Sequence, residues 1–203
     1  GFPANLLLSG KRVLVVGAGR VAARKTAALL DVDADVHVVA PQVGDEMREL
    51  VVAGSVSLDE RPFADSDLDD VWLAFTATDD PAVNAAVQAA GDARRIWVNA
   101  ADDPDNCSFT LMSSFRRGDI VVSIGSGGRS PALAKWLRER MENEIGPEYT
   151  TLLEILSEAR EEMRADGRSS EDADWRSAFD AGILDLVRTG KVEDAKELLR
   201  SCL

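Results

Sequence analysis

The stretch VLVVGAGRVA at residues 13–22 decides the fold of this chain. Its four leading apolar residues are typical of a buried strand, and helix-forming residues follow at 23–30. Between them, Gly17 permits a tight turn and Gly19 lets the backbone approach a pyrophosphate, while the small Ala22 allows close packing of helix on strand. The phosphates would then meet the free N–H groups and the positive dipole end of the helix. The stretch therefore indicates a dinucleotide-binding turn.

A second apolar strand at residues 36–39 completes a βαβ unit, which favours this interpretation over a glycine turn that binds no cofactor. No acid follows that strand, although an acid there normally accepts hydrogen bonds from the ribose. The chain continues through Pro41 and Gln42, so we expect backbone groups and these residues to hold the adenosine. No arginine directly follows the strand either, which favours NAD over NADP. The residues expected to contact NAD stand at strand ends or at the helix start: Gly17, Gly19, Arg20, Val21, Pro41, Gln42 and Thr78.

The composition excludes several classes of function. The 203 residues carry 36 acidic and 23 basic side chains, which gives a formal net charge of −13. Such a surface repels nucleic acid, so no nucleic-acid partner is expected. No apolar run reaches the roughly 18 residues of a membrane span, and the first residues lack a signal-peptide pattern. We therefore expect a cytoplasmic protein without a membrane partner. Cys107 and Cys202 are far apart and His37 is the only histidine, so no metal site is expected.

Strands and helices alternate along the first half of the chain. After the βαβ unit, strands are expected at 55–58, 71–77 and 96–99, with helices at 44–53 and 82–90. This alternation predicts an α/β, Rossmann-like domain over residues 1–112, with a parallel sheet covered by helices on both faces. Ligands bind such sheets at the carboxyl ends of the strands. Four segments should meet there: 17–21, 40–42, 77–80 and 99–103.

The pattern changes after residue 108. Residues 108–112 are expected to be extended, with a turn at 116–119 and a strand at 120–124, and this connection is too short for a crossover helix. An antiparallel pair outside the main sheet follows from that spacing. Ser130 and Pro131 then form a typical helix start. The helix presents Leu133, Trp136, Leu137 and Met141 on one apolar face and ends before Gly146.

An apolar helix face in so short a segment lacks a core of its own, so we expect a small α+β dimerisation segment at 113–146 and a homodimer. Residues 147–203 are helical in pattern throughout and form a predicted C-terminal helical domain. Three helices are expected there. The first ends near Gly167, the second continues from Trp175 to Gly190, and the third carries Val192, Ala195 and Leu199.

Taken together, the motifs resemble a known family, precorrin-2 dehydrogenase, which is the dehydrogenase and ferrochelatase module of siroheme synthase. The resemblance covers roughly residues 1–145. It implies NAD-dependent oxidation of precorrin-2 to sirohydrochlorin, in some members followed by insertion of ferrous iron, and a homodimer that exchanges its central segment. The matching stretches are NLLL at 5–8, GAGRVAARK at 17–25, ATDDPAVN at 77–84, VNAADDPDNCSF at 98–109 and SGGRSPALA at 126–134.

The resemblance also implies that Asp102 is the catalytic acid or base. Oxidation of the macrocycle removes a hydride and a proton, and a positioned carboxylate can accept that proton. An acidic loop start is the alternative, and Asp103 before Pro104 is the expected turn residue. Asp80 and Asn84 are interpreted as cap and helix-face groups. Without a His or Cys cluster, a sirohydrochlorin ferrochelatase activity would share the site of Asp102.

A cyclic tetrapyrrole with eight carboxylates needs a local cationic surface on so acidic a protein. Arginines that can bind carboxylates bidentately gather after the predicted sheet, although each could instead be a solvated surface charge. Ser126 lies in the glycine-rich loop that would face the substrate, and a flexible turn is its alternative interpretation. The expected substrate-binding residues are Arg116, Arg117, Ser126 and Arg129, with Arg138 and Arg140 in the same cluster.

Two other functions remain open at this point. A non-catalytic NAD-sensing module would keep the glycine turn and the parallel sheet, but it would need neither the Asp102 segment nor the arginine-rich stretch. A dehydrogenase of another class would place a His, Lys or Tyr at the sheet edge, whereas His37 stands within a predicted strand and Tyr149 lies beyond the glycine loop.

Overall fold

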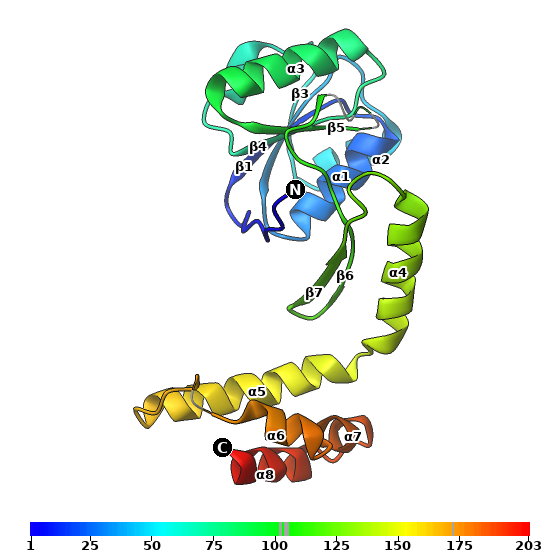
Figure 1. Cartoon of the computed structure of the whole chain (residues 1–203). Coiled ribbons are helices and arrows are strands. Elements are labelled where there is room, and N and C mark those ends of the chain that lie inside the picture. The colour runs from blue at the N-terminus through cyan, green and yellow to red at the C-terminus, as the bar shows by residue number, and fades with distance from the viewer. Residues whose placement is uncertain (102, 104–105, 172) are drawn as a thin grey trace. The chain divides into compact units, whose positions relative to one another are not determined.

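The computed structural model describes residues 1–101, 103, 106–171 and 173–203 (Figure 1). The chain forms two compact units, Gly1–Thr110 and Leu111–Leu203. The first contains a parallel sheet, and the second contains a β-hairpin and helices. The finer division into three parts at residues 112 and 146 stays a prediction.

The first unit is built on a five-stranded parallel sheet with the order β3-β2-β1-β4-β5. The central position of β1 explains its uninterrupted apolar sequence, because Val13 and Leu14 are fully buried on opposite faces. The predicted Rossmann-like α/β fold is confirmed. The strands are β1 (Arg12–Val16), β2 (Asp35–Val39), β3 (Ser57–Asp59), β4 (Leu73–Thr76) and β5 (Trp97–Ala100).

Helices cover both faces of this sheet (Figure 1). Helices α1 (Arg20–Leu30) and α2 (Asp45–Val52) pack against one face in a core that includes Val15. Helix α3 (Pro81–Arg94) and the short 3-10 helix η1 (Asp65–Leu68) pack against the other face. Alternate residues of the central strands β1, β2 and β4 therefore supply two separate cores, one per face.

Helix α3 lies unusually close to the sheet. A Cβ atom on Gly91 would lie 2.4 Å from Cγ2 of Val98, so only glycine fits at this point of the helix. The helix begins as expected, because the Asp80 side chain accepts a hydrogen bond from Ala82 N at 2.9 Å. It runs four residues beyond the predicted end at residue 90 and stops at Arg95, which adopts a φ of 60°.

The chain that returns after β5 runs along the outer side of that strand. Ser108 N donates to Val98 O at 2.8 Å, and Val98 N donates to the Ser108 hydroxyl at 3.3 Å. The next residue, Phe109, packs edge-on against the ring of Phe75 with 5.5 Å between ring centroids. This segment therefore belongs to the first unit and extends its core.

The second unit begins with the antiparallel hairpin β6 (Ser113–Arg117) and β7 (Ile120–Ile124). The predicted antiparallel pair is confirmed, but its first strand at 108–112 is wrong, as is the turn over 116–119. The turn contains only Gly118 and Asp119, and Gly118 takes a φ of +55°. Strand β6 extends this far because Arg116 and Arg117 pair with Val121 and Ile120 of β7, and Phe115 within the strand is buried.

That helix is α4 (Pro131–Glu144), and it starts where the sequence predicts. The Ser130 hydroxyl accepts a hydrogen bond from Leu133 N at 3.2 Å, which confirms the N-cap. Ala134 is the buried contact of the helix, whereas Leu133 is 50% and Trp136 is 53% exposed. An apolar face thus remains uncovered within the described part of the chain.

Four further helices share one core at the end of the chain. The predicted continuous helix over 175–190 is wrong, because the chain bends at Gly182, which adopts a φ of +89°. The bend buries Ile183 but leaves Phe179 46% exposed beside a groove of about 430 Å³. Glycine allows this bend, since a side chain there would be strained. The helices are α5 (Glu148–Ala165), α6 (Trp175–Asp180), α7 (Ile183–Arg188) and α8 (Val192–Cys202).

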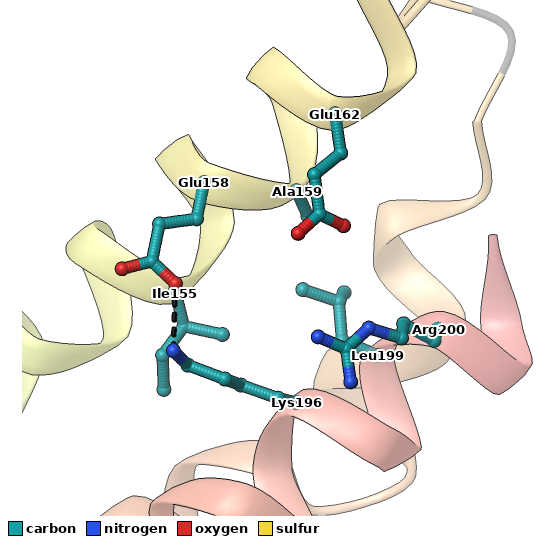
Figure 2. A pocket seen from close by; sticks show the side chains of 7 residues that line it. All are labelled: Ile155, Glu158, Ala159, Glu162, Lys196, Leu199 and Arg200. Carbon is teal, nitrogen blue, oxygen red and sulfur yellow. Dashed lines mark ion pairs between the residues drawn. The ribbon is translucent and has the colours of Figure 1, made fainter. Parts of the chain in front are cut away.

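An ion pair bridges α5 and α8, where Glu158 Oε2 lies 2.7 Å from Lys196 Nζ (Figure 2). Glu162 and Arg200 extend toward each other one turn along (Figure 2). The gap between these side chains measures about 10 Å³, which holds at most one water molecule. This gap is therefore a packing feature of the helices rather than a ligand site.

Candidate dinucleotide-binding site

The glycine turn after β1 has room only for glycine at its first position. Gly17 adopts a φ of +103°, and an added Cβ atom would lie 2.5 Å from the carbonyl oxygen of Ala77. Two backbone hydrogen bonds fix the turn, from Gly17 N to Val39 O and from Ala77 N to Val16 O, both at 2.9 Å. The ends of β1, β2 and β4 are thereby held together.

The start of α1 is open. Gly19 is the N-cap residue, and no side chain caps the helix. A Cβ atom added to Gly19 would have no neighbouring atom within 4 Å. Arg20 and Val21 are the first helical residues, so their region carries unsatisfied N–H groups and the positive end of the dipole. A pyrophosphate can approach this backbone without a steric obstacle, which is the requirement for a dinucleotide.

The segments after β2 and β5 reach the same edge of the sheet. Gly44 N donates to Ala18 O at 2.9 Å, which draws the segment carrying Pro41 and Gln42 against the glycine turn. Ala101 N donates to Thr76 O at 2.8 Å beyond the end of β5. The expected convergence of four segments at the carboxyl ends of the strands therefore holds for the described residues.

A buried amide fixes the loop that carries Thr78. Asn84 is only 4% exposed, and its Oδ1 accepts hydrogen bonds from the hydroxyls of Thr76 and of Thr78, the latter at 2.8 Å. Its Nδ2 donates to the carbonyl oxygen of Thr78 at 3.2 Å. The interpretation of Asn84 as a helix-face group does not include this role, although its position one turn before the buried Val87 of α3 is a signal for it.

A second unpredicted network joins α1 to β5. Lys25 Nζ donates to Asn99 Oδ1 at 3.1 Å and lies 5.1 Å from the ring centroid of Phe75. Asn99 is 6% exposed, and its Nδ2 donates to Phe109 O at 2.9 Å. An ammonium group is therefore held beside the strand that leads to the predicted catalytic segment.

Asp102, the predicted catalytic residue, lies outside the described residues. Its neighbour Asp103 accepts hydrogen bonds from Asn106 through both Oδ2, at 2.8 Å, and its carbonyl oxygen, at 3.2 Å. The Cys107 sulfur lies 3.3 Å from the carbonyl oxygens of Asp103 and Ala100. These contacts agree with the expected turn role of Asp103, and they place the Cys107 thiol at the end of β5.

The expected substrate-binding residues belong to the second unit. Arg116 lies on β6 and Arg129 in the loop before α4, and both side chains are exposed. The Ser126 hydroxyl accepts a hydrogen bond from Ser130 N at 3.1 Å, so it helps to start α4. Arg117 instead donates to the carbonyl oxygens of Ile145, at 3.1 Å, and Glu142, at 3.2 Å, at the end of α4.

The two remaining arginines of this cluster also have intramolecular contacts. Arg138 pairs with Glu142 and, at 3.2 Å, with Glu139, and the Arg140 guanidinium lies 5.7 Å from the ring centroid of Trp136. Arg116 and Arg129 are therefore better placed than Arg117 or Arg138 to bind carboxylates.

Within the described residues, no group of three or more His, Cys, Asp and Glu side chains could hold a metal ion. In the same part of the chain, none of the helices combines the length and hydrophobicity of a membrane span.

Comparison with known proteins confirms the resemblance found in the sequence. The chain is 38% identical over 198 residues to the siroheme synthase of Tolumonas auensis, which covers 97% of this chain and 42% of that protein. It is 32% identical to the siroheme synthase of Nitrosococcus oceani, over 100% of this chain and 44% of that protein. The chain therefore spans less than half the length of these curated relatives.

A solved structure is similar over the whole chain. The structure of SirC, a precorrin-2 dehydrogenase, superimposes with a TM-score of 0.72 at 26% identity, over 100% of this chain and 98% of that one. A protein-family model described as "Putative NAD(P)-binding" matches residues 4–113, the stretch that contains the whole parallel sheet. Because that match covers more than half of the 203 residues, the chain belongs to the "Putative NAD(P)-binding" family.

Proposed function

We propose that the chain oxidises precorrin-2 to sirohydrochlorin with NAD as the hydride acceptor. The observation that carries the proposal is the glycine turn at α1, where Gly17 cannot bear a Cβ atom and Gly19 leaves the helix start open. The similarity to siroheme synthases and to a precorrin-2 dehydrogenase supports the choice of substrate. NAD supplies a carbon that accepts a hydride, and the protein supplies position and a base.

In this proposal the first unit holds the dinucleotide. The N–H groups at Arg20 and Val21 bind the pyrophosphate, while Pro41 and Gln42 contact the adenosine. Asn84 fixes the backbone of Thr78, which presents that loop to the other half of the cofactor. Each residue acts by orienting the dinucleotide, so that the macrocycle carbon that loses the hydride faces the acceptor.

The macrocycle itself is bound by cations and deprotonated by a carboxylate. Arg116 and Arg129, with Ser126, bind substrate carboxylates, and Arg117 serves mainly to hold α4. Asp102 accepts the proton that leaves when the hydride is transferred. We further propose that ferrous iron enters sirohydrochlorin at the same site as a second substrate, with Asp102 as base for the pyrrole N–H groups.

A homodimer is part of the proposal. The exposed Leu133 and Trp136 on α4 form the surface that a second copy would cover. The cytoplasmic location expected from the sequence remains a prediction.

The test is direct. Purified protein is mixed with precorrin-2 and either NAD or NADP, and reduced cofactor is followed by its absorbance. Faster turnover with NAD than with NADP is expected. Binding of NAD without any oxidation of precorrin-2 would contradict the proposal and favour a non-catalytic sensing module. Addition of ferrous iron to the product then tests metal insertion against the spontaneous rate.

A further inference from the structure

We propose that the ion-paired cluster Asp59, Arg61 and Asp67 at the end of β3 makes the site select NAD over NADP. The inference rests on the proposed use of a nicotinamide dinucleotide but not on precorrin-2. In this proposal Asp59 on β3 takes the role of the acid that is missing after β2. The proposal also gives a reason why Arg61, although nearby, does not bind a 2′-phosphate.

The first observation is the position of Asp59. It is the last residue of β3 and lies in register with Val39 of β2. Ala40 N donates to Asp59 O at 3.1 Å, so Asp59 stands beside the residue that precedes Pro41. The carboxyl ends of parallel strands share one edge, and the adenosine half of a dinucleotide binds along that edge near the second strand. Asp59 is therefore an acid at the ribose end of the candidate site.

The second observation is that Arg61 is already engaged. Its Nη2 lies 2.7 Å from Oδ2 of Asp59 and 2.7 Å from Oδ1 of Asp67. Its Nη1 lies 2.9 Å from the other oxygen of Asp67, so the pair with Asp67 is bidentate. Because an arginine near this position is what accommodates the 2′-phosphate of NADP, its engagement by two carboxylates removes the expected ligand.

The third observation is the charge that remains. Asp59, Asp67 and Arg61 together carry a net negative formal charge, with His37, whose Nε2 lies 3.7 Å from Asp59 Oδ2, counted as neutral. A 2′-phosphate would add like charge. A ribose 2′-hydroxyl can instead donate a hydrogen bond to Asp59. A second arginine near the end of β3 is also paired with an acid: Arg48 of α2 lies 3.8 Å from the carboxylate of Glu60, the residue after Asp59. Arg61 and Arg48 are thus each paired with an acid.

Arg61 and Asp67 stabilise each other's charged forms. The hydrogen bond from Arg61 to Asp67 raises the pKa of Arg61 above its ordinary value. Burial opposes ionisation of Asp67, but hydrogen bonds from Arg61 and from Ala64 N outweigh it and lower the pKa of Asp67. The Asp67 side chain is only 5% exposed and anchors the arginine, whereas Asp59 is 45% exposed and accessible to a ligand.

The experiment measures NAD and NADP binding to the full chain by titration calorimetry, separately from turnover. In Asp59→Asn the acceptor charge is lost and Arg61 is partly released, so the ratio of NAD to NADP affinity should fall about tenfold. Asp59→Ser tests the same point should the first variant fold poorly. Arg61→Gln added to Asp59→Asn should cancel any gain in NADP affinity. Asp69→Asn is the matched control, because it removes an exposed acid paired with Arg94 at 3.2 Å and leaves Arg61 untouched.

The outcomes separate this inference from the proposed function. An affinity ratio that changes less than about twofold in both Asp59 variants would overturn it. A wild-type protein that binds NADP more tightly than NAD would also overturn the inference. Failure of the wild-type chain to bind either cofactor would overturn both proposals. If the ratio shifts as expected while precorrin-2 is not oxidised, the assignment of the cluster stands and the proposed reaction fails.

Discussion

The carbonyl oxygen of Ala77 lies 2.5 Å from the position that a Cβ atom on Gly17 would occupy. The loops after β1 and β4 are therefore in contact through a position that tolerates no side chain. The φ of +103° at Gly17 adds a conformational reason to the steric one.

Gly17→Ala should lower the free energy of unfolding by roughly 2 kcal/mol and weaken NAD binding at least tenfold, because the two loops must separate. Thermal denaturation and NAD titration measure the two effects. Gly19→Ala is the control, since its φ of −80° and the open space around it allow a methyl group. That variant should keep its stability within about 1 kcal/mol yet still bind NAD less well. Unchanged stability of Gly17→Ala would contradict the geometry.

Asn84→Ala should destabilise the first unit by about 2 kcal/mol or more, because it leaves the buried Thr76 hydroxyl without its acceptor. It should also weaken NAD binding by freeing the Thr78 loop. Urea unfolding and calorimetry provide the measurements. Asp92→Ala, an exposed change on the same helix, should alter stability by less than about 1 kcal/mol. Equal effects of the two variants would count against a role of Asn84 in holding this loop.

Asp102→Asn should reduce oxidation of precorrin-2 by about 10²–10⁴-fold and leave the NAD dissociation constant nearly unchanged. Metal insertion, where present, should fall with it, since both steps use the same base. Asp103→Asn is the comparison, because Asp103 is engaged by Asn106 as a turn residue. Full activity of Asp102→Asn would remove Asp102 from the mechanism.

Trp136→Glu should convert the proposed dimer to a monomer, because it places a charge on the exposed apolar face of α4. Light scattering at micromolar concentration measures the change. Trp72→Glu serves as control, since Trp72 belongs to the first unit and is 63% exposed. Its ring centroid lies 4.2 Å from Lys11 Nζ. A wild-type monomer would refute the dimer outright.

The helical end of the chain should lose stability in acid. A hydrogen bond from the Ser177 side chain lowers the pKa of Asp174. The pKa of Glu148 is lowered by a hydrogen bond from the backbone N–H of Glu148 itself and by one from Arg188. Depressed carboxyl pKa values stabilise the folded state above the ordinary values of 3.8 and 4.5, and this stability is lost as the pH falls through the folded values.

Urea unfolding between pH 7 and pH 3 tests this expectation. Asp174→Asn and Glu148→Gln should each flatten the pH dependence, whereas Glu161→Gln, an exposed acid within α5 and away from a helix start, should not. A pH profile that is the same in all four proteins would contradict the assignment.

The parallel sheet was predictable because its signals are local. The apolar run at Val13–Val16 and the glycine at position 17 specify strand and turn without knowledge of the remaining chain. The hairpin was misplaced for the same reason, since Arg116, Arg117 and Gly118 read locally as a turn. Only the pairing of Arg116 and Arg117 with Val121 and Ile120 shows that the strand continues through them. The break at Gly182 was missed because a lone glycine is tolerated within a helical pattern.

The polar networks of the site could not be predicted from local patterns. Lys25 and Asn99 are 74 residues apart, and nothing in either neighbourhood indicates their contact. The same applies to Arg61, which looks like an ordinary loop residue until Asp59 and Asp67 are seen on both sides of it. Such side chains are paired by the topology of the sheet, which brings distant strand ends to one edge.

The hydrogen bonds between Ser108 and Val98 have a consequence for how copies of this protein can associate. A strand at the border of a sheet normally offers its free N–H and C=O groups as a template for a strand from another molecule. Here both backbone groups of Val98 are already satisfied by Ser108 of the same chain. Continuation of the sheet from one molecule into the next is therefore blocked at β5, and this border of the protein is protected against open-ended growth into fibres.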